Sequence, residues 1–302
     1  MIITNAVLTA LKTALRDEFR NRMTELDAQG IWKILATIIP SSTKSNTYGW
    51  LGAFPQMREW VGDRVIKNMA DFAYQIANQK WESTLGVDRT DIEDDNLGQY
   101  RVMAREMADE FERFMNRKLA ALITGGFTNL CFDGQKFFDA AHPVYPSSDG
   151  TGTAAEVSNV IGTGSGSPWA LLSLAGSLKP FIVQQRTQPE FEEITDTKND
   201  SVFMKDRYLY GIRYRGSWGY GLWQQAVASK QALSAANYEA ARLAMQTFKR
   251  DGGDPLGITP THLIVSPANE AAARAILTRE LINGGESNPN YHTAELVVVP
   301  HL

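Results

Sequence analysis

The segment CFDGQKFFDAAHP, residues 131–143, brings together the side chains of this sequence that are best suited to chemistry. It contains the only cysteine of the chain, Cys131, and one of its four histidines, His142, with Asp133 and Asp139 between them. A thiol activated by a histidine can act as a nucleophile, and thiolate, carboxylate and imidazole groups are common metal ligands. The segment therefore raises two catalytic hypotheses, a cysteine hydrolase and a metal-dependent enzyme.

The sequence around these residues matches the known pattern of neither class of enzyme. No signature of a cysteine hydrolase surrounds the cysteine or the histidine, and the donor spacing differs from that of calcium loops and two-histidine metal motifs. A structural interpretation needs fewer assumptions: Asp133 and Gly134 form a turn, and the rings of Phe137 and Phe138 anchor the loop on a neighbouring helix. We therefore favour a structural loop, and we expect no cofactor and no metal.

The element that must position this segment is a long helix directly before it. Apolar residues recur at helical spacing over residues 98–124, and a pair of glycines then ends the pattern. About 27 residues at 1.5 Å each give a rod of about 40 Å, which we term the spine helix. A second amphipathic helix is predicted over residues 5–29.

Composition narrows the class of protein. The chain has 302 residues, 43% of them apolar, which is enough for a folded protein with a substantial core. Its 30 basic and 34 acidic residues give a net charge of -4, which disfavours tight binding of nucleic acid by counterion release. A single cysteine excludes an internal disulfide framework and fits a reducing compartment. We find no signal-peptide pattern and no apolar stretch of about 18 residues, so we expect no membrane contact.

Large aromatic residues occur where the sequence offers them few local partners. Residues 31–60 lack periodicity, and alternating apolar residues then predict two strands, around Ile76 and Leu85, that pair as a projecting hairpin through a turn at residues 78–79. Because neither segment can bury bulky rings by itself, we expect both to lie on neighbouring subunits. The expected inter-subunit contact residues are Trp32, Trp50, Phe54, Trp60, Phe72, Tyr74 and Trp81.

The second half of the chain mixes strands and helices without a regular βαβ repeat. Residues 147–167 are rich in Gly, Ser and Thr and predict a mobile loop, and their GTGSGS run lacks the lysine that a phosphate-binding loop requires. Alternating patterns predict strands over 181–195 and 207–223. A helix is predicted from Ser234, and a strand, a helix and a strand over 262–299. This mixture favours an α+β fold.

Five blocks of the sequence resemble the Mu-like phage major head subunit of the gpT type. They are, in chain order, CFDGQKFFDAAHPV, KPFIVQQRTQPEF, DRYLYGIRYRGSWGYGLWQQAVAS, DPLGITPTHLIVSPANEAAARAIL and AELVVVPHL. The resemblance covers almost the whole chain. It implies a major capsid protein of a tailed bacteriophage or prophage, which is not an enzyme and self-assembles into the icosahedral head that encloses double-stranded DNA.

The resemblance also implies an architecture and a set of partners. The fold is expected to be the phage major capsid fold of the Hong Kong 97 type, with an N-terminal arm over 1–47, an E-loop hairpin over 48–97, a peripheral domain over 98–225 and an axial domain over 226–302. The expected partners are further copies in hexamers and pentamers, a separate scaffolding protein, the portal and a decoration protein. Packaged DNA is expected to be contacted only non-specifically, and the protein to be found in the virion after assembly in the host cytoplasm.

Two alternatives stay open on the residues alone. One is a cytoplasmic hydrolase or metal-dependent enzyme with a site at Cys131, Asp133, Asp139 and His142, and the other is a small-molecule binding module built on residues 262–299. On the capsid hypothesis, replacing Cys131 and His142 by Ala leaves assembly nearly intact. Deleting residues 70–88 is then expected to leave a soluble subunit that cannot close a shell.

Overall fold

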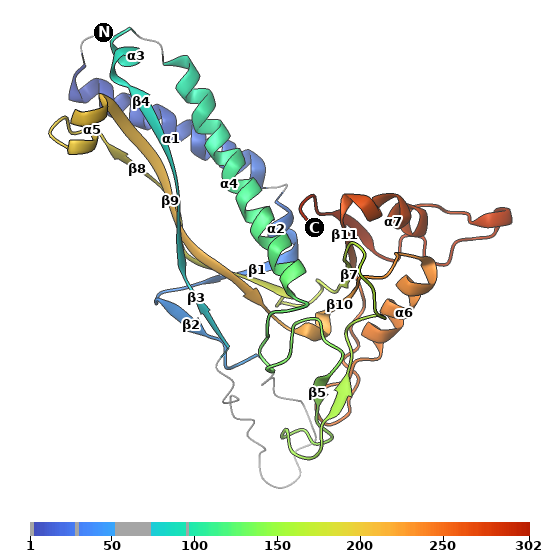
Figure 1. Ribbon diagram of the computed structural model, residues 1–302. Coiled ribbons are helices and arrows are strands. Elements are labelled where there is room, and N and C mark those ends of the chain that lie inside the picture. Colours follow the sequence, from blue (N-terminus) through green and yellow to red (C-terminus); the bar gives the residue numbers. More distant parts are fainter. Residues whose placement is uncertain (1–2, 28–29, 52–73, 95–96) are drawn as a thin grey trace.

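The computed structural model describes residues 3–27, 30–51, 74–94 and 97–302. Its described part is an elongated α+β molecule with two four-stranded β-sheets, each covered by helices (Figure 1). The first sheet carries two long helices, and the second sheet and its shorter helices lie at the other end of the molecule (Figure 1). No helix among the described residues is long and apolar enough to cross a membrane.

The first sheet has the strand order β1-β8-β9-β4. Its strands are β1 (Ala36–Pro40), β4 (Gln79–Asp88), β8 (Phe181–Ile194) and β9 (Arg207–Tyr220). β1 runs parallel to β8, whereas the β8–β9 and β9–β4 pairs are antiparallel. The two strands predicted over 181–195 and 207–223 are confirmed. In β9, the side chains of alternate residues such as Tyr208 and Tyr210 are buried, because one face of the sheet is covered.

Two long helices cover that face of the first sheet, and they are α1 (Asn5–Asp27) and α4 (Gly98–Gly125). The rings of Phe111 on α4 and Tyr214 on β9 meet edge to face, with centroids 5.2 Å apart. The two helices lie side by side, and Arg22 of α1 forms an ion pair at 2.8 Å with Asp109 of α4. The spine helix predicted over 98–124 is therefore confirmed as α4, and the first predicted helix as α1.

The predicted hairpin between residues 72 and 87 is wrong. β3 (Gln75–Ala77) pairs with β2 (Ser45–Thr47), whereas β4 pairs along its length with β9. The alternating pattern identified β4 correctly as a strand but carried no information on its partner. Trp81 lies opposite Tyr214, so β4 is an edge strand of the first sheet and not one arm of a projecting hairpin.

The second sheet has the strand order β10-β7-β11-β12. Its strands are β7 (Trp169–Leu172), β10 (Ala226–Ser229), β11 (His262–Val265) and β12 (Glu295–Val298), and its helices are α6 (Ala235–Gln246) and α7 (Glu270–Leu277). β11 and β12 are parallel and joined through α7, which confirms the predicted strand, helix and strand. The Ser234 hydroxyl caps α6 by accepting a hydrogen bond from the backbone N–H of Asn237. Strand β7 enters this sheet from the range predicted to form the peripheral domain.

The second part of the predicted mobile loop over residues 147–167 is held by main-chain hydrogen bonds. The N–H of Ile161 donates to Ala228 O at 2.9 Å, and that of Gly166 donates to Lys230 O at 2.9 Å. A Cβ atom on Gly164 would lie 2.5 Å from Lys230 O, so the glycine permits this close approach. In this part of the loop, Gly164 therefore serves close packing.

The remaining elements are short. β5 (His142–Val144) and β6 (Ala155–Val157) form a two-stranded antiparallel sheet beside the second sheet. The other helices are α2 (Ile31–Leu35), α3 (Arg89–Glu93) and α5 (Asp200–Lys205), and the 3-10 turns are η1 (Trp223–Gln225), η2 (Pro267–Asn269) and η3 (Asn283–Gly285).

Candidate functional site

The loop that follows α4 places Cys131 and Asp133 by a tight turn. The N–H of Gly134 donates to Cys131 O at 3.2 Å, and Gly134 has a φ of 80°, a backbone conformation that favours glycine. Asp133 Oδ1 accepts hydrogen bonds from the N–H of Gln135 at 3.0 Å and from the Cys131 thiol at 3.1 Å. The predicted Asp133–Gly134 turn is confirmed.

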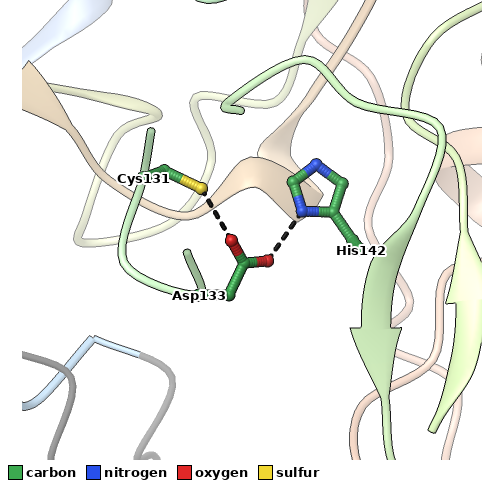
Figure 2. A group of neighbouring side chains, drawn as sticks. All are labelled: Cys131, Asp133 and His142. Carbon is green, nitrogen blue, oxygen red and sulfur yellow. Dashed lines mark hydrogen bonds and ion pairs between the residues drawn. The ribbon is translucent and has the colours of Figure 1, made fainter. Parts of the chain in front are cut away.

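The histidine reaches the same place from another element, since His142 begins β5. Its Nδ1 lies 2.7 Å from Asp133 Oδ2, and its fully buried ring is stacked on that of Trp223, with centroids 4.1 Å apart. Figure 2 shows Asp133 between Cys131 and His142, with one carboxylate oxygen facing each. Three of the four side chains predicted to form a site therefore meet, and we call them the Cys-Asp-His cluster.

Asp139 is the exception, because its carboxylate does not join the cluster. Its Oδ1 accepts a hydrogen bond from the N–H of Ala141 at 3.1 Å, and its own N–H donates to Asn159 Oδ1 at 2.9 Å. Asp139 thus stabilises the loop locally, as an Asx turn does.

Asn159 is the residue that sequence reasoning missed. Its side chain is fully buried, and its Nδ2 donates to the main-chain carbonyls of Phe137, Trp223 and Ala226 at 2.8, 3.4 and 3.2 Å. These bonds fix the direction of the amide, so its oxygen faces His142 Nε2 at 3.3 Å. Asn159 lies in the Gly-, Ser- and Thr-rich stretch, where no local pattern distinguishes it.

Both nitrogen atoms of the buried His142 ring face an oxygen atom. The Asn159 oxygen can only accept, and Asp133 Oδ2 also accepts if the carboxylate is ionised, so both ring nitrogens of His142 face acceptors. Burial alone raises the pKa of Asp133, but hydrogen bonds and charge from His142 outweigh it and lower that pKa below its ordinary value of 3.8. Asp133 and Asn159 thus hold the buried His142 ring from its two nitrogen atoms.

The thiol of Cys131 is unsuited to nucleophilic chemistry. Its side chain is buried, and burial together with the Asp133 charge raises the pKa of the thiol far above its ordinary value of 9.0. The thiol donates to the carboxylate, not to the histidine, so the base of a Cys-His pair is not in position. The geometry gives no support to the hydrolase hypothesis.

The cluster is also a poor metal site. The ligand atoms of Cys131, Asp133 and His142 lie within 4.8 Å of one another, the one such group found in the described part of the chain. A closed structural zinc site needs four protein ligands, and here three donors already satisfy each other by hydrogen bonds. The arrangement serves to fasten a loop, because it joins the segment after α4 to β5, η1 and the start of β10.

The family model of the Mu-like prophage major head subunit gpT matches residues 8–302.

The chain belongs to this family.

Curated relatives and solved structures agree with the family. The head subunit is 42% identical over 307 residues to the major capsid protein of Escherichia phage Mu, with all of both chains covered, and 38% identical over 283 residues to the Mu-like prophage FluMu major head subunit of Haemophilus influenzae, with 92% and 91% covered. The chain in the procapsid of bacteriophage JBD30 matches with a TM-score of 0.88 at 44% identity, covering 99% of this chain and 100% of that one. The chain in the JBD30 capsid matches with a TM-score of 0.76 at 32% identity, covering 99% and 98%.

These matches settle the class of protein. The head subunit is a structural capsid protein of the Mu-like type and not an enzyme, and it forms the icosahedral head of the virion. Its fold is the α+β phage major capsid fold of the Hong Kong 97 type. The surfaces that matter for its function are therefore those that meet other subunits.

The aromatic residues predicted to make inter-subunit contacts have partners within the head subunit wherever they are described. Trp32 is 5% exposed and donates from Nε1 to Glu112 Oε2 at 2.9 Å on α4, so its ring leaves no surface for a neighbour. The Tyr74 hydroxyl accepts a hydrogen bond from the N–H of Tyr220 at 2.7 Å. Trp50 is half-buried, with its ring centroid 6.1 Å from that of Tyr48.

Trp81 is likewise half-buried within its own chain. Its ring lies against those of Phe114 and Trp218, with centroids 4.9 and 6.0 Å away, and the ammonium of Lys118 lies 4.0 Å from its centroid. Phe54, Trp60 and Phe72 lie outside the described residues. Trp32 is therefore buried within its own chain, contrary to the expectation that it needs a neighbouring subunit, whereas the half-buried rings of Trp50, Tyr74 and Trp81 keep some exposed surface.

Proposed function

We propose that the head subunit assembles into the hexamers and pentamers of the icosahedral head, and that the head encloses double-stranded DNA without gripping it. The observation that supports this proposal is a set of large apolar side chains that stay exposed on ordered elements. Among the described residues, the most exposed are Val102, Leu130, Phe203, Met204, Leu243 and Leu281, at 56–78% of their full surface. Contact with other copies would remove this surface from water.

The domain division that we propose follows the two sheets, and the first sheet takes β1 from the arm and β4 from the range of the E-loop. We propose that residues 1–47 act as the N-terminal arm, that the E-loop lies within 48–97, and that the first sheet with α4 forms the peripheral domain. The axial domain then corresponds to the second sheet. Because β7 belongs to that sheet, this domain would take residues 169–172 as well as 226–302.

Inter-subunit contact is proposed for the half-buried rings of Trp50, Tyr74 and Trp81 and for Phe54, Trp60 and Phe72. The last three lie in the segment 52–73, which follows Trp50 in the sequence. Burial of such a ring between subunits contributes about 2 kcal/mol or more.

We also propose partners other than further copies of the chain. A solved JBD30 capsid is decorated with minor capsid protein trimers, and its chain is 34% identical to the head subunit with a TM-score of 0.74 over 90% of each chain. By analogy we propose a comparable decoration protein here, together with a separate scaffolding protein and the portal. The net charge of -4 supports contact with the packaged DNA that is non-specific and weak.

Electron microscopy of the head subunit co-produced with its scaffolding protein tests the proposal. Closed shells are expected from the natural chain. A variant in which a short Gly-Ser linker replaces residues 54–71 should give a folded subunit without shells, because it keeps β2, β3 and β4 and removes the proposed contact residues Phe54 and Trp60. Normal shells from this variant would overturn the proposed role of the E-loop, and discrete small particles from the natural chain would overturn the assembly proposal.

A further inference from the structure

An ordered hairpin projects from the second sheet beyond α7. Residues 279–287 leave the body of the molecule after α7 and return before β12 (Figure 1). Leu281 and Ser287 form an antiparallel bridge, and the N–H of Ile282 donates to Glu286 O at 2.9 Å. Gly284 and Gly285, with φ of 82° and 85°, make the turn, so the projection has a defined backbone.

The base of this hairpin is fastened by a buried amide. Asn288 is 8% exposed, and its Nδ2 donates to Ile276 O and to Arg279 O at 2.8 and 2.7 Å. Its own N–H donates to Glu280 O at 2.9 Å. Such bonds hold both strands of the hairpin at the end of α7, which fixes the direction in which it projects.

The hairpin presents apolar side chains at its exposed end. Leu281 is 56% exposed and Ile282 is 42% exposed, and we call these two residues the hairpin tip. Exposed leucine and isoleucine on a fastened backbone lose little conformational entropy on binding, so their burial would be favourable. Nothing in the body of the described subunit covers the hairpin tip.

A second apolar surface lies on the outer face of α6. Leu243 is 64% exposed, and Ala236 and Ala240 are exposed at positions i−7 and i−3 from it, on the same side of the helix. We call these three residues the α6 stripe. The base of the hairpin and α6 are tied together, because Asn290 Nδ2 donates to Glu239 Oε1 at 2.7 Å.

We propose that the hairpin tip of one head subunit packs on the α6 stripe of the next copy around a capsomer. A ring of identical subunits requires two different, complementary patches on each subunit, one that projects and one that receives. Copies related by rotation bring equivalent halves of the molecule together, so the tip should meet the second-sheet half of its neighbour. Within described residues 226–302, the large apolar residues left exposed besides the tip are Leu243 and Tyr291. This contact rests on the proposed assembly into hexamers and pentamers and names the surfaces that would build them.

Disulfide trapping tests the contact, and the chain suits it because its single natural cysteine, Cys131, is buried. The variant carrying Leu281→Cys and Leu243→Cys is assembled with the scaffolding protein, oxidised, and run on a denaturing gel without reductant. A ladder of linked subunits up to the size of a capsomer is expected, since a disulfide forms only where the Cβ atoms lie about 4 Å apart. Each single variant, and a control pair of Leu130→Cys with Leu243→Cys, should give no ladder.

The outcomes separate this contact from the assembly proposal itself. Shells without a ladder would overturn the contact and leave the assembly proposal standing, and dimers from either single variant would replace the ring contact by a two-fold one. A second variant, Leu281→Asp with Ile282→Asp, should keep the melting temperature of the isolated subunit but lower the shell yield at least tenfold. Wild-type shell yield from it would overturn the contact, and normal shells that fail to bind a minor capsid protein would assign the tip to that partner.

Discussion

His142 has a structural role, which is to connect several segments of the chain through hydrogen bonds and ring stacking. A fully buried imidazole ring is held by Asp133 on one nitrogen and Asn159 on the other, and it is stacked on Trp223. Burying polar groups is costly, and this network is stable because each of its polar atoms has a hydrogen-bond partner. Removing one member leaves the others without that partner.

The first prediction concerns His142 and the stability of the isolated subunit. His142→Ala should lower the free energy of unfolding by about 2–4 kcal/mol, because Asp133 and Asn159 lose a hydrogen-bond partner and the missing ring leaves a cavity beside Trp223. Urea denaturation of the isolated subunit measures the change. His301→Ala, at an exposed histidine, should have no effect, and equal stability of the two variants would contradict the structural role of His142.

The second prediction concerns how the stability contributed by Asp133 depends on pH. Because the folded state lowers the pKa of Asp133, the ionised carboxylate stabilises the fold above its ordinary value of 3.8, and this stabilisation is lost as the pH falls through that value and below it. The stability difference between the natural chain and Asp133→Asn should therefore shrink as the pH falls from 6 towards 3. Denaturation curves across this range provide the test, and a difference that grows on acidification would refute it.

At the scale of elements, the end of α4 is set by how closely the following loop approaches. A Cβ atom on Gly126 would lie 2.7 Å from Cδ2 of Phe138, one of the two rings that anchor the loop. The neighbouring ring of Phe137 is stacked on Tyr220 with centroids 4.6 Å apart. α4 therefore ends at the point where the backbone comes into close contact with the ring of Phe138.

Gly126→Ala should destabilise the subunit by about 1–3 kcal/mol, since the new methyl group would force the Phe138 ring to move. Gly98→Ala is the matched control at the other end of α4, where a Cβ atom meets nothing within 4 Å. It should be neutral or slightly stabilising because alanine favours the helix. Thermal melting of both variants distinguishes close packing from a general sensitivity of α4.

Strand β4 stabilises the subunit because its residue Trp81 packs on α4. Trp81 rests on Phe114 of α4, so Trp81→Ala should lower the stability of the isolated subunit by about 2–4 kcal/mol. Deleting residues 70–88 removes this strand, and an unfolded product is now expected in place of a soluble one. Glu82→Ala, on the exposed side of the same strand, is the control. A Trp81 variant with full stability and defective shells would instead assign this ring mainly to an inter-subunit contact.

At the scale of the whole molecule, the loop over 131–143 joins the two sheets. Phe137 packs on Phe181 and Tyr220 of the first sheet, while Asn159 bonds to Ala226, where the second sheet begins. One continuous hydrophobic core accordingly includes residues of both sheets. The segment whose residue types suggest a reaction centre therefore connects the part of the molecule built on the first sheet with the part built on the second sheet.

A continuous core predicts that the isolated subunit unfolds in one cooperative transition. Tryptophan fluorescence, which reports on both halves through Trp81 and Trp169, and far-ultraviolet circular dichroism should give the same melting temperature. In the His142→Ala variant the single transition should split, because this connection between the two sheets is weakened. Two separate transitions in the natural chain would show that the halves fold independently.

The sequence by itself determined the elements that depend on local periodicity and, through its five blocks, the family. The spine helix, the strands β8 and β9 and the strand, helix and strand near the C-terminus follow from spacing that every residue carries with it. The Asp133–Gly134 turn follows from local chemistry in the same way.

Only the tertiary structure decided which elements meet. β4 pairs with β9 rather than β3, and Trp32 is buried on α4. Asn159 forms hydrogen bonds with residues 17 positions or more away. Local spacing could not predict these contacts, because strand pairing and burial depend on segments that are distant in the chain. The sequence spacing brought Cys131, Asp133 and His142 together as candidates for one site. Whether that site is reactive or structural depends on burial and on the direction of each hydrogen bond. Those quantities exist only once the chain has folded.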